Sequence, residues 1–123
     1  MNKRVTGLGG IFFKSNDPKA MKAWYAKHLG VGDVFQWYPA EGEKPEQPAQ
    51  TIWSPFKQDT TYFAPSKKEF MLNYRVENLQ ELLNVLKEEG IEQVGEIQVY
   101  PYGKFGWIVD PEGNKIELWE PVD

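Results

Sequence analysis

The stretch Gly103–Pro121, GKFGWIVDPEGNKIELWEP, decides the fold of this chain. Side chains alternate with a period of two on both sides of Asp110–Gly113, which predicts two short strands. Asp110–Gly113 supplies turn chemistry: the Asp side chain accepts from the backbone two residues on, Pro presets φ, and Gly tolerates a left-handed exit. The stretch therefore predicts a β-hairpin that places Glu117 among aromatic and basic neighbours.

Glu117 needs a partner, because an ionised carboxylate on a mostly apolar sheet face is costly unless a metal ion or a cation neutralises it. The candidate cations are Arg75, Lys14 and Lys115. Arg75 is the best of them, because its planar fork can bind a carboxylate in two places and it shares a predicted strand face with Met71 and Asn73. The alternative is that Glu117 is an ordinary charge at the rim of the sheet, neutralised by water. Both interpretations stay open at this stage.

Composition bounds the class of protein. The chain has 123 residues with 41% hydrophobic and 15% aromatic content, a net charge of −4 and no cysteine. We expect one domain, no disulfide or thiolate site, and a cytoplasmic location. The sequence has no stripe of basic residues that would predict a nucleic-acid partner, and no apolar run long enough to predict a membrane span. We interpret the apolar N-terminal stretch as a first strand, because no small-residue cleavage site follows it.

Two parts of the chain repeat one order of elements, a strand, a capped helix ending at glycine, and three strands. In the first part, the pattern predicts strands over Val5–Ser15, Val31–Tyr38, Gln50–Phe56 and Thr60–Ala64, and a helix from Asp17 to Gly30. The second predicts strands over Phe70–Val76 and Glu96–Tyr100 before the hairpin, with a helix from Asn78 to Gly90. The fold class is therefore α+β: one domain of two βαβββ modules (about 1–66 and 67–123), forming a curled, mostly antiparallel sheet with a concave cup.

Each predicted helix carries an apolar stripe that we expect to be buried. The stripes are Met21, Trp24, Tyr25 and His28 in the first helix, and Leu79, Leu82, Leu83 and Leu86 in the second. His28, the only histidine, is expected to pack or to complement the helix dipole rather than bind a metal. The segment Pro39–Ala49 is expected to be a solvated loop, with a lid over the cup as the alternative.

Aromatic side chains are concentrated on the predicted strands or their ends. They are Phe12, Trp37, Trp53, Phe56, Tyr62, Phe63, Tyr100, Tyr102, Phe105, Trp107 and Trp119. A concave surface lined by rings suits a flat, partly apolar ligand, whereas the alternative is that the rings fill a core or a dimer interface. The predicted ligand-binding residues are Phe12, Trp37, Trp53, Tyr62, Asn73, Arg75, Tyr102, Trp107, Glu117 and Trp119.

The repeat, with DPKAMKAWYAKHLGV opening the first unit and DPEGNKIEL closing the second, resembles the vicinal oxygen chelate superfamily. Its members include glyoxalases, extradiol dioxygenases, methylmalonyl-CoA epimerases and bleomycin-resistance proteins. The resemblance implies metal ligands on the first and last strands of each unit. Glu117 matches the final ligand, whereas the other positions fall at Gly10, at Met71 and within Thr60–Ala64, where no metal ligand of the usual kind stands.

We therefore expect a glyoxalase- or bleomycin-resistance-like protein that binds a small organic ligand in an aromatic cup, without a cofactor or a divalent metal. The resemblance implies a homodimer. One alternative is a metal-dependent lyase or dioxygenase with displaced ligands around Glu117, and a second is a non-catalytic interaction module. The residues leave open whether the protein is an enzyme, and no catalytic residue is assigned.

Overall fold

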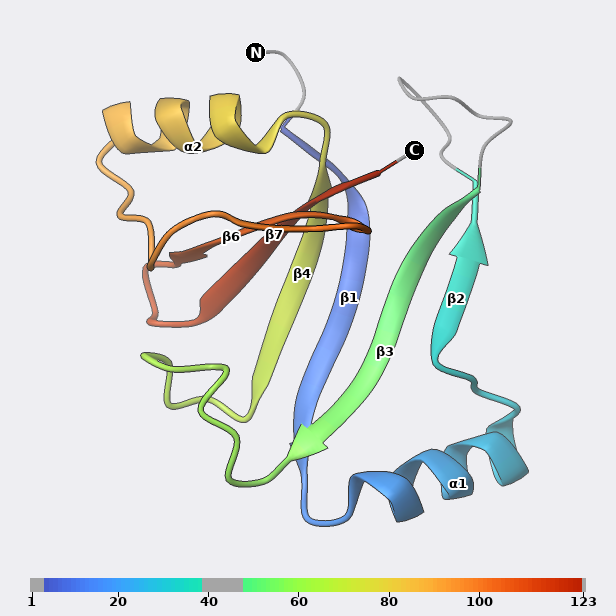
Figure 1. The fold of residues 1–123 in the computed structure, drawn as a ribbon. Helices are drawn as coiled ribbons and strands as arrows, with labels where there is room; N and C mark the ends of the chain where they lie inside the picture. The colour runs from blue at the N-terminus through green and yellow to red at the C-terminus, as the bar shows by residue number, and fades with distance from the viewer. Residues whose placement is uncertain (1–3, 39–47, 123) are drawn as a thin grey trace.

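The computed structural model describes residues 4–38 and 48–122 (Figure 1). The predicted loop at Pro39–Ala49, with the question of whether it is a lid, falls mostly outside the described residues. Neither helix in the described ranges is long and apolar enough to cross a membrane.

Seven strands and two helices make up the described chain. In order they are β1 (Val5–Ser15), α1 (Pro18–Leu29), β2 (Val34–Trp37), β3 (Ala49–Lys57), β4 (Phe70–Val76), α2 (Leu79–Glu88), β5 (Gln98–Tyr100), β6 (Gly103–Val109) and β7 (Lys115–Pro121). The strands form one sheet in the order β2-β3-β1-β4-β7-β6-β5. The β1–β3 and β4–β7 pairs are parallel and the other pairs are antiparallel.

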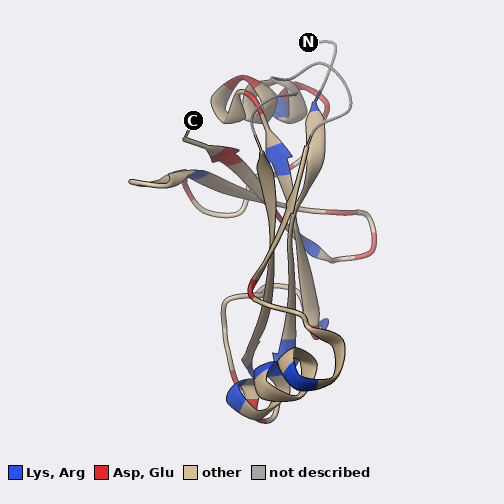
Figure 2. Cartoon of the chain, turned by 90° about the vertical axis from the view of Figure 1, so that its right-hand side faces the viewer, with Lys and Arg blue, Asp and Glu red and all other residues tan. Residues whose placement is uncertain are grey.

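The sheet is strongly curled. Figure 1 shows β6 and β7 running across the direction of β1, β3 and β4, with α1 and α2 at opposite ends of the molecule. Figure 2, which views the sheet from the side, shows most charged residues on the helices and loops and few on the strands. The predicted α+β class and the curled, mostly antiparallel sheet are confirmed, while the division into two repeats within one domain stays a prediction.

The predicted hairpin and both predicted helix starts are confirmed. Asp110 Oδ1 accepts from the backbone N–H groups of Glu112 and Asn114, each at 2.9 Å, and so fixes the turn between β6 and β7. Asp17 caps α1 through Ala20 N at 3.0 Å, and Asn78 caps α2 through Glu81 N at 3.0 Å. These short polar side chains satisfy backbone donors that a strand end or a helix start leaves open.

The predicted strand at Thr60–Ala64 is wrong, because this segment folds as turns. Hydrogen bonds from Thr60 N to Lys57 O, from Ala64 N to Thr61 O and from Ser66 N to Phe63 O all span three residues. Such local bonding satisfies the backbone without a neighbouring strand. β3 is instead the last strand of the first unit, since it lies parallel to β1 as β7 lies parallel to β4.

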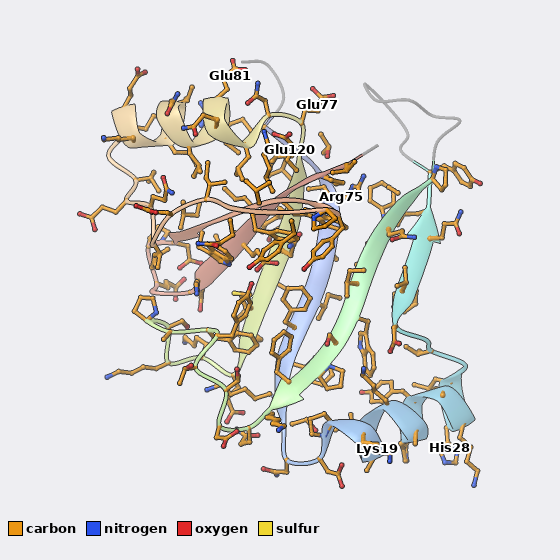
Figure 3. The ribbon with its side chains drawn as sticks, viewed as in Figure 1. Lys19, His28, Arg75, Glu77, Glu81 and Glu120 are labelled. Atoms are coloured by element: carbon orange, nitrogen blue, oxygen red, sulfur yellow. The ribbon has the colours of Figure 1, made fainter. Side chains whose placement is uncertain are left out.

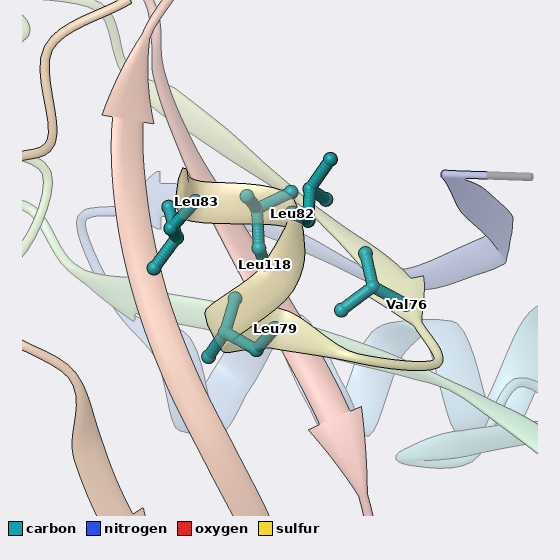
Figure 4. Close-up of a cluster of buried hydrophobic side chains, with 5 residues drawn as sticks. All are labelled: Val76, Leu79, Leu82, Leu83 and Leu118. Atoms are coloured by element: carbon teal, nitrogen blue, oxygen red, sulfur yellow. The ribbon is translucent and has the colours of Figure 1, made fainter. Parts of the chain in front are cut away.

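The two helices are buried to very different extents. Leu79, Leu82 and Leu83 of α2 are buried against Val76 and Leu118 (Figure 4), and Leu86 packs at the edge of this cluster. The predicted stripe of α2 is thus confirmed.

The predicted stripe of α1 is wrong, because no residue of this helix is buried. α1 lies across the ends of the strands rather than along a face of the sheet (Figure 1). Trp24 is 52% exposed, and His28 is exposed on the outer side of the helix, pointing away from the sheet (Figure 3). Tyr25 makes the main ring contact to the sheet, with Trp53 at 4.8 Å between centroids.

Glycines in β1 allow side chains from other strands to pack directly on its backbone. A Cβ atom on Gly9 would lie 2.1 Å from Asn73 Oδ1 and 3.1 Å from the Trp119 ring, and one on Gly7 would lie 2.2 Å from the Trp37 ring. These distances are far below van der Waals contact, so a larger residue forces its neighbours to move. The glycines of β1 are therefore required by packing.

We expect Gly9→Ala to lower the free energy of unfolding by about 1–3 kcal/mol, the usual cost of overpacking a buried position. Gly32→Ala is the matched control: its Cβ would meet no atom within 4 Å, so we expect a change within about 0.5 kcal/mol. Urea denaturation followed by tryptophan emission measures both. Equal effects of the two substitutions would contradict the packing argument.

Candidate functional site

The Glu117 carboxylate is buried and fully hydrogen-bonded by neutral donors. The side chain is 2% exposed. Oε1 accepts from Asn73 Nδ2 at 2.6 Å, and Oε2 accepts from Trp107 Nε1 at 2.9 Å and from the Tyr62 hydroxyl. The sheet register produces this arrangement, because Glu117 on β7 lies opposite Asn73 on β4 and Trp107 on β6. Neighbouring strands thus bring donors to both carboxylate oxygens.

The expectation that Arg75 neutralises Glu117 is wrong. Arg75 lies opposite Trp119 on β7, two residues beyond Glu117. Its guanidinium lies over the rings of Trp119 and Trp37, at 5.3 and 5.9 Å from their centroids. The alternative of a hydrated charge at the rim is also wrong, because burial excludes water from the Glu117 side chain.

Lys115 is the cation that acts on Glu117 electrostatically. Its Nζ donates to Tyr62 O at 2.7 Å and lies over the rings of Tyr62 and Trp107. Burial lowers the pKa of the Lys115 amine, and the nearby Glu117 charge opposes this shift only in part. Two aromatic faces and a carbonyl oxygen therefore hold a largely desolvated ammonium group.

The chain itself fills the concave face around Glu117. The turns between β3 and β4 insert Phe63, which is 1% exposed, into a cluster with Phe12, Met71 and Trp107. Tyr62 stands beside them and stacks on Phe56 at 5.7 Å between centroids. Burial and the adjacent Glu117 charge raise the pKa of the Tyr62 hydroxyl, so it remains a proton donor. The centre of the predicted cup is therefore a core.

The residues at the metal positions that the sequence resemblance implies do not fit a divalent ion. Phe12 and Asn73 each lie five residues before a helix cap, and they pair with Ser54 and Glu117, respectively. The first-unit equivalent of Glu117 is thus Ser54 on β3, and the placement within Thr60–Ala64 is wrong.

The set of equivalent positions is Gly10, Ser54, Met71 and Glu117, which offers one carboxylate and one hydroxyl. A Cβ on Gly10 would lie 2.7 Å from the Phe12 ring, so packing blocks a ligand side chain there. No cluster of three metal-binding side chains occurs within residues 4–38 and 48–122. Both Glu117 oxygens already accept hydrogen bonds, and a divalent ion needs several convergent donors.

An open hollow lies next to the filled centre. We call it the outer hollow; it has a volume of about 480 Å³. Its lining residues are Pro48, Gln50, Arg75, Pro101, Tyr102, Trp119, Pro121 and Val122. Figure 3 shows Arg75 near the ends of β4 and β7, at the end of the sheet away from α1. The outer hollow thus joins ring faces, proline rings and one guanidinium.

Nine of the ten predicted ligand-binding residues fall into two groups. The group at the filled centre comprises Phe12, Tyr62, Asn73, Trp107 and Glu117. The group at or beside the outer hollow comprises Trp37, Arg75, Tyr102 and Trp119.

Trp53 belongs to neither group. It packs against Phe13 and Tyr25, at 5.3 and 4.8 Å between centroids, on the side of α1. Strand alternation explains this placement, because its neighbour Ile52 packs with the cluster at the filled centre. Its assignment to the aromatic cup is wrong.

The proline residues that line the outer hollow were not predicted from the sequence. Pro48, Pro101 and Pro121 come from three distant parts of the chain, and Gln50 joins them from β3. Pro101, between β5 and β6, and Pro121, at the end of β7, gave the available signal, because proline at strand ends faces a sheet edge. No signal in the sequence linked Pro48 to them.

We expect Tyr62→Phe to lower the free energy of unfolding at pH 8 by about 1.5–3 kcal/mol, the usual worth of a hydrogen bond to a charged group. The folded-state pKa of Tyr62 is raised above its ordinary value of 10.0. Its contribution is therefore complete below pH 10 and is lost above it, since the unfolded tyrosine ionises first.

Urea denaturation at pH 8 and pH 11 measures the difference between wild type and Tyr62→Phe, which we expect to shrink at the higher pH. Tyr38→Phe, which removes the hydroxyl from an exposed ring, is the control at pH 8. A difference for Tyr62→Phe that grows with pH would contradict this assignment.

Comparison with known proteins gives one family. The model of the Glyoxalase/Bleomycin resistance protein/Dioxygenase superfamily matches residues 8–118. Among curated proteins, no sequence matches this chain at a significant level.

Several solved structures share the fold. Methylmalonyl-CoA epimerase from Mycobacterium tuberculosis is 22% identical with a TM-score of 0.68, over 100% of this chain and 93% of that chain. A variant of the Streptomyces coelicolor methylmalonyl-CoA epimerase, in complex with 2-nitronate-propionyl-CoA, is 12% identical with a TM-score of 0.67, over 97% and 99%. A structure described as NAD-dependent benzaldehyde dehydrogenase from Legionella pneumophila is 12% identical with a TM-score of 0.58, over 92% and 98%.

At these identities the solved structures establish the fold alone. The family match spans nearly the whole chain, from β1 to β7, and the resemblance inferred from its two sequence signatures is confirmed. The chain therefore belongs to the Glyoxalase/Bleomycin resistance protein/Dioxygenase superfamily.

Proposed function

We propose that this protein binds a small, flat, partly apolar organic molecule in the outer hollow and does so without a divalent metal. The observation that carries the proposal is the outer hollow itself, about 480 Å³ lined by Trp119, Tyr102 and Arg75. Three other hollows of the described chain have volumes of about 530, 640 and 630 Å³, so the lining rather than the volume distinguishes the outer hollow. The exposed ring of Tyr102 and the proline rings provide apolar contact for a flat molecule.

The metal-free part of the proposal rests on donor chemistry. Three neutral donors and the Lys115 ammonium compensate the Glu117 charge. In this arrangement Glu117 accepts hydrogen bonds from Asn73, Trp107 and Tyr62. These bonds stabilise β4 and β7, the strands that carry Arg75 and Trp119 of the outer hollow. In this proposal the ligand-binding residues are Trp37, Arg75, Tyr102 and Trp119. Tyr62, Asn73 and Trp107 have a structural role, because they hydrogen-bond Glu117.

A metal-dependent enzyme is the second candidate. It is favoured by the likeness to methylmalonyl-CoA epimerases, whose structures include complexes with methylmalonyl-CoA and 2-nitronate-propionyl-CoA, and by the acid retained at Glu117. Under this function the turns that carry Tyr62 and Phe63 would have to leave the concave face before an ion could reach Glu117. A non-catalytic interaction module is the third candidate, favoured by the exposed rings of Tyr100 and Tyr102.

Elemental analysis and ligand titration together separate these functions. We expect protein purified without chelator to contain less than about 0.1 equivalent of any divalent metal, since a single carboxylate holds such an ion weakly. We also expect a panel of bicyclic aromatic compounds to include binders that raise the melting temperature and quench tryptophan emission. A stoichiometric metal that protects against unfolding would favour the enzyme, and a panel without any binder would favour the interaction module.

Two tryptophan variants locate the binding site in the same titration. We expect Trp119→Phe to weaken binding, because this ring lines the outer hollow. Trp53→Phe is the matched control, since Trp53 packs against Tyr25 on the side of α1, outside the outer hollow. Equal loss of binding in both variants would argue against the outer hollow.

The proposal includes a homodimer. β2 is an edge strand that exposes Val34 and Phe35, and the neighbouring helix α1 exposes Trp24 and Leu29. An apolar strand edge next to an apolar helix surface is a common feature of protein interfaces. Sedimentation equilibrium should give twice the chain mass of 14.2 kDa, and a monomer at micromolar concentration would contradict this part. A cytoplasmic location stays a prediction.

A further inference from the structure

We infer that a second binding site lies in the open groove beside the end of α2, where an aliphatic amine binds with its chain against apolar side chains and its ammonium group at Glu92. We call this site the aliphatic groove; it has a volume of about 630 Å³. Its apolar lining is mainly aliphatic and includes Leu86, Ile91, Val94, Ile108, Val109 and Ile116. It shares no lining residue with the outer hollow, so the inference goes beyond the proposed function and does not depend on it.

The aliphatic groove lies where both hydrophobic clusters of the chain reach the surface. Leu86, Ile108 and Ile116 pack against the buried cluster beneath α2, and Val94 packs against the cluster at the filled centre. These four side chains are only partly buried, and Ile91 is 36% exposed. Figure 1 shows the end of α2, the loop after it and the turn between β6 and β7 at one edge of the molecule, opposite β2. An aliphatic chain in the groove therefore extends apolar packing that the fold leaves open.

Backbone hydrogen bonds fix the loop that forms one wall of the aliphatic groove. Ile91 N donates to Leu86 O at 2.9 Å, and Val94 N donates to Trp107 O at 2.8 Å. Between them, Gln93 forms an isolated antiparallel bridge with β6. The loop is thus attached to α2 at one end and to the sheet at the other. The groove is formed before a ligand enters, so binding costs little ordering of the chain.

The lining favours a flexible aliphatic chain over a flat ring. Pro65 and Pro111 join the aliphatic side chains, and none of the described lining residues is aromatic. The outer hollow, in contrast, is lined by Tyr102 and Trp119. A flat ring gains from stacking on other rings, whereas an aliphatic chain gains from each methylene group that leaves water. The two hollows therefore suit different classes of molecule.

The rim of the aliphatic groove favours a cation. Glu92 is exposed there, and its carboxylate takes part in no hydrogen bond or ion pair within residues 4–38 and 48–122. Asp110 also lines the groove, and hydrogen bonds from Asn114 lower the pKa of its carboxyl group, so it is ionised at neutral pH. The groove lies at the C-terminal end of α2, where the helix dipole carries partial negative charge. Two carboxylates and a helix end thus attract an ammonium group.

Two lysines near the groove reduce this attraction without reversing it. Lys68 lies close enough to Asp110 to act on its charge, and Lys87 is in the last turn of α2. Neither belongs to the lining of the aliphatic groove. Glu92 is therefore the main contact for the ammonium group, and the preference for a cation should have the size of an exposed ion pair.

Three probes test the ligand class. Octylamine, which is protonated at neutral pH, and octanoate have chains of similar length and opposite charge, and hexylamine carries the same ammonium group on a shorter chain. In NMR titrations of the isotope-labelled protein at low salt, we expect octylamine to bind about fivefold more tightly than octanoate. It should bind about tenfold more tightly than hexylamine, because two more methylene groups leave water. The amide signals of Ile91, Val94 and Ile108 should shift, whereas that of Tyr102 in the outer hollow should not.

One pair of variants tests the charge. Glu92→Gln should reduce the preference for octylamine over octanoate to about twofold or less, because the main ionic contact is lost. Glu81→Gln is the matched control, since Glu81 lies in the first turn of α2, at the other end of the helix (Figure 3), and should keep the full preference. Rising salt concentration should also reduce the preference of the wild-type protein, because ions screen the contact.

A second pair tests the chain contact. Ile91→Ser should weaken binding of octylamine and octanoate alike, because it removes apolar surface from the groove. Leu29→Ser removes an exposed leucine of α1, outside the groove, and should change neither affinity. Near-ultraviolet circular dichroism shows whether each variant keeps its tertiary packing, and Glu92→Gln keeps the test decisive if Ile91→Ser disturbs the loop.

The outcomes separate this inference from the proposed function. Equal binding of octylamine and octanoate, or a preference that Glu92→Gln leaves intact, would overturn the amine class. Signal shifts confined to the outer hollow, or the absence of any shift, would overturn the site itself. Because the two hollows share no lining residue, either result leaves the binding of flat molecules to be judged by its own titration.

Discussion

The burial of the Glu117 carboxylate is the constraint on which the rest of the structure depends. A charge removed from water is tolerated only when hydrogen bonds or an opposite charge replace its hydration. Asn73, Trp107 and Tyr62 supply those hydrogen bonds from three separate elements, and Lys115 supplies the charge. Since the donors come from different elements, their hydrogen bonds to Glu117 link the turns after β3 to strands β4, β6 and β7. Removing any one donor would leave the buried charge partly unsatisfied.

The hydrogen-bonded Glu117 site fills the centre of the curled sheet with side chains of the chain itself. Neutral donors bind both oxygens of the acid, and Phe12 and Phe63 occupy the space around it. The concave face is therefore a core at its centre and a hollow at its edge, which Arg75, Tyr102 and Trp119 line. The two regions share β4 and β7, because Asn73 and Glu117 of the buried site lie on the same two strands as Arg75 and Trp119 of the outer hollow.

The two helices of the fold are buried to different extents. α2 buries its leucines on the sheet, whereas α1 lies across the strand ends and buries no residue. β3 carries Ser54 opposite Phe12 of its parallel partner β1, whereas β7 carries Glu117 opposite Asn73 of its parallel partner β4. Asymmetry of this kind shows that one fold supports different local chemistry, and function must be argued from the site itself.

The sequence by itself determined the local structure: the hairpin with its Asp110 turn, both helix caps, and the bounds of β1 and β4. Each follows from residues close together in the chain, as does the presence of a lone acid at position 117. Only the tertiary structure decided its partners, because Asn73 and Trp107 are placed by the sheet register and Tyr62 by a turn, rather than by periodicity. The proline walls of the outer hollow were decided in the same way, since packing between distant segments leaves no local pattern.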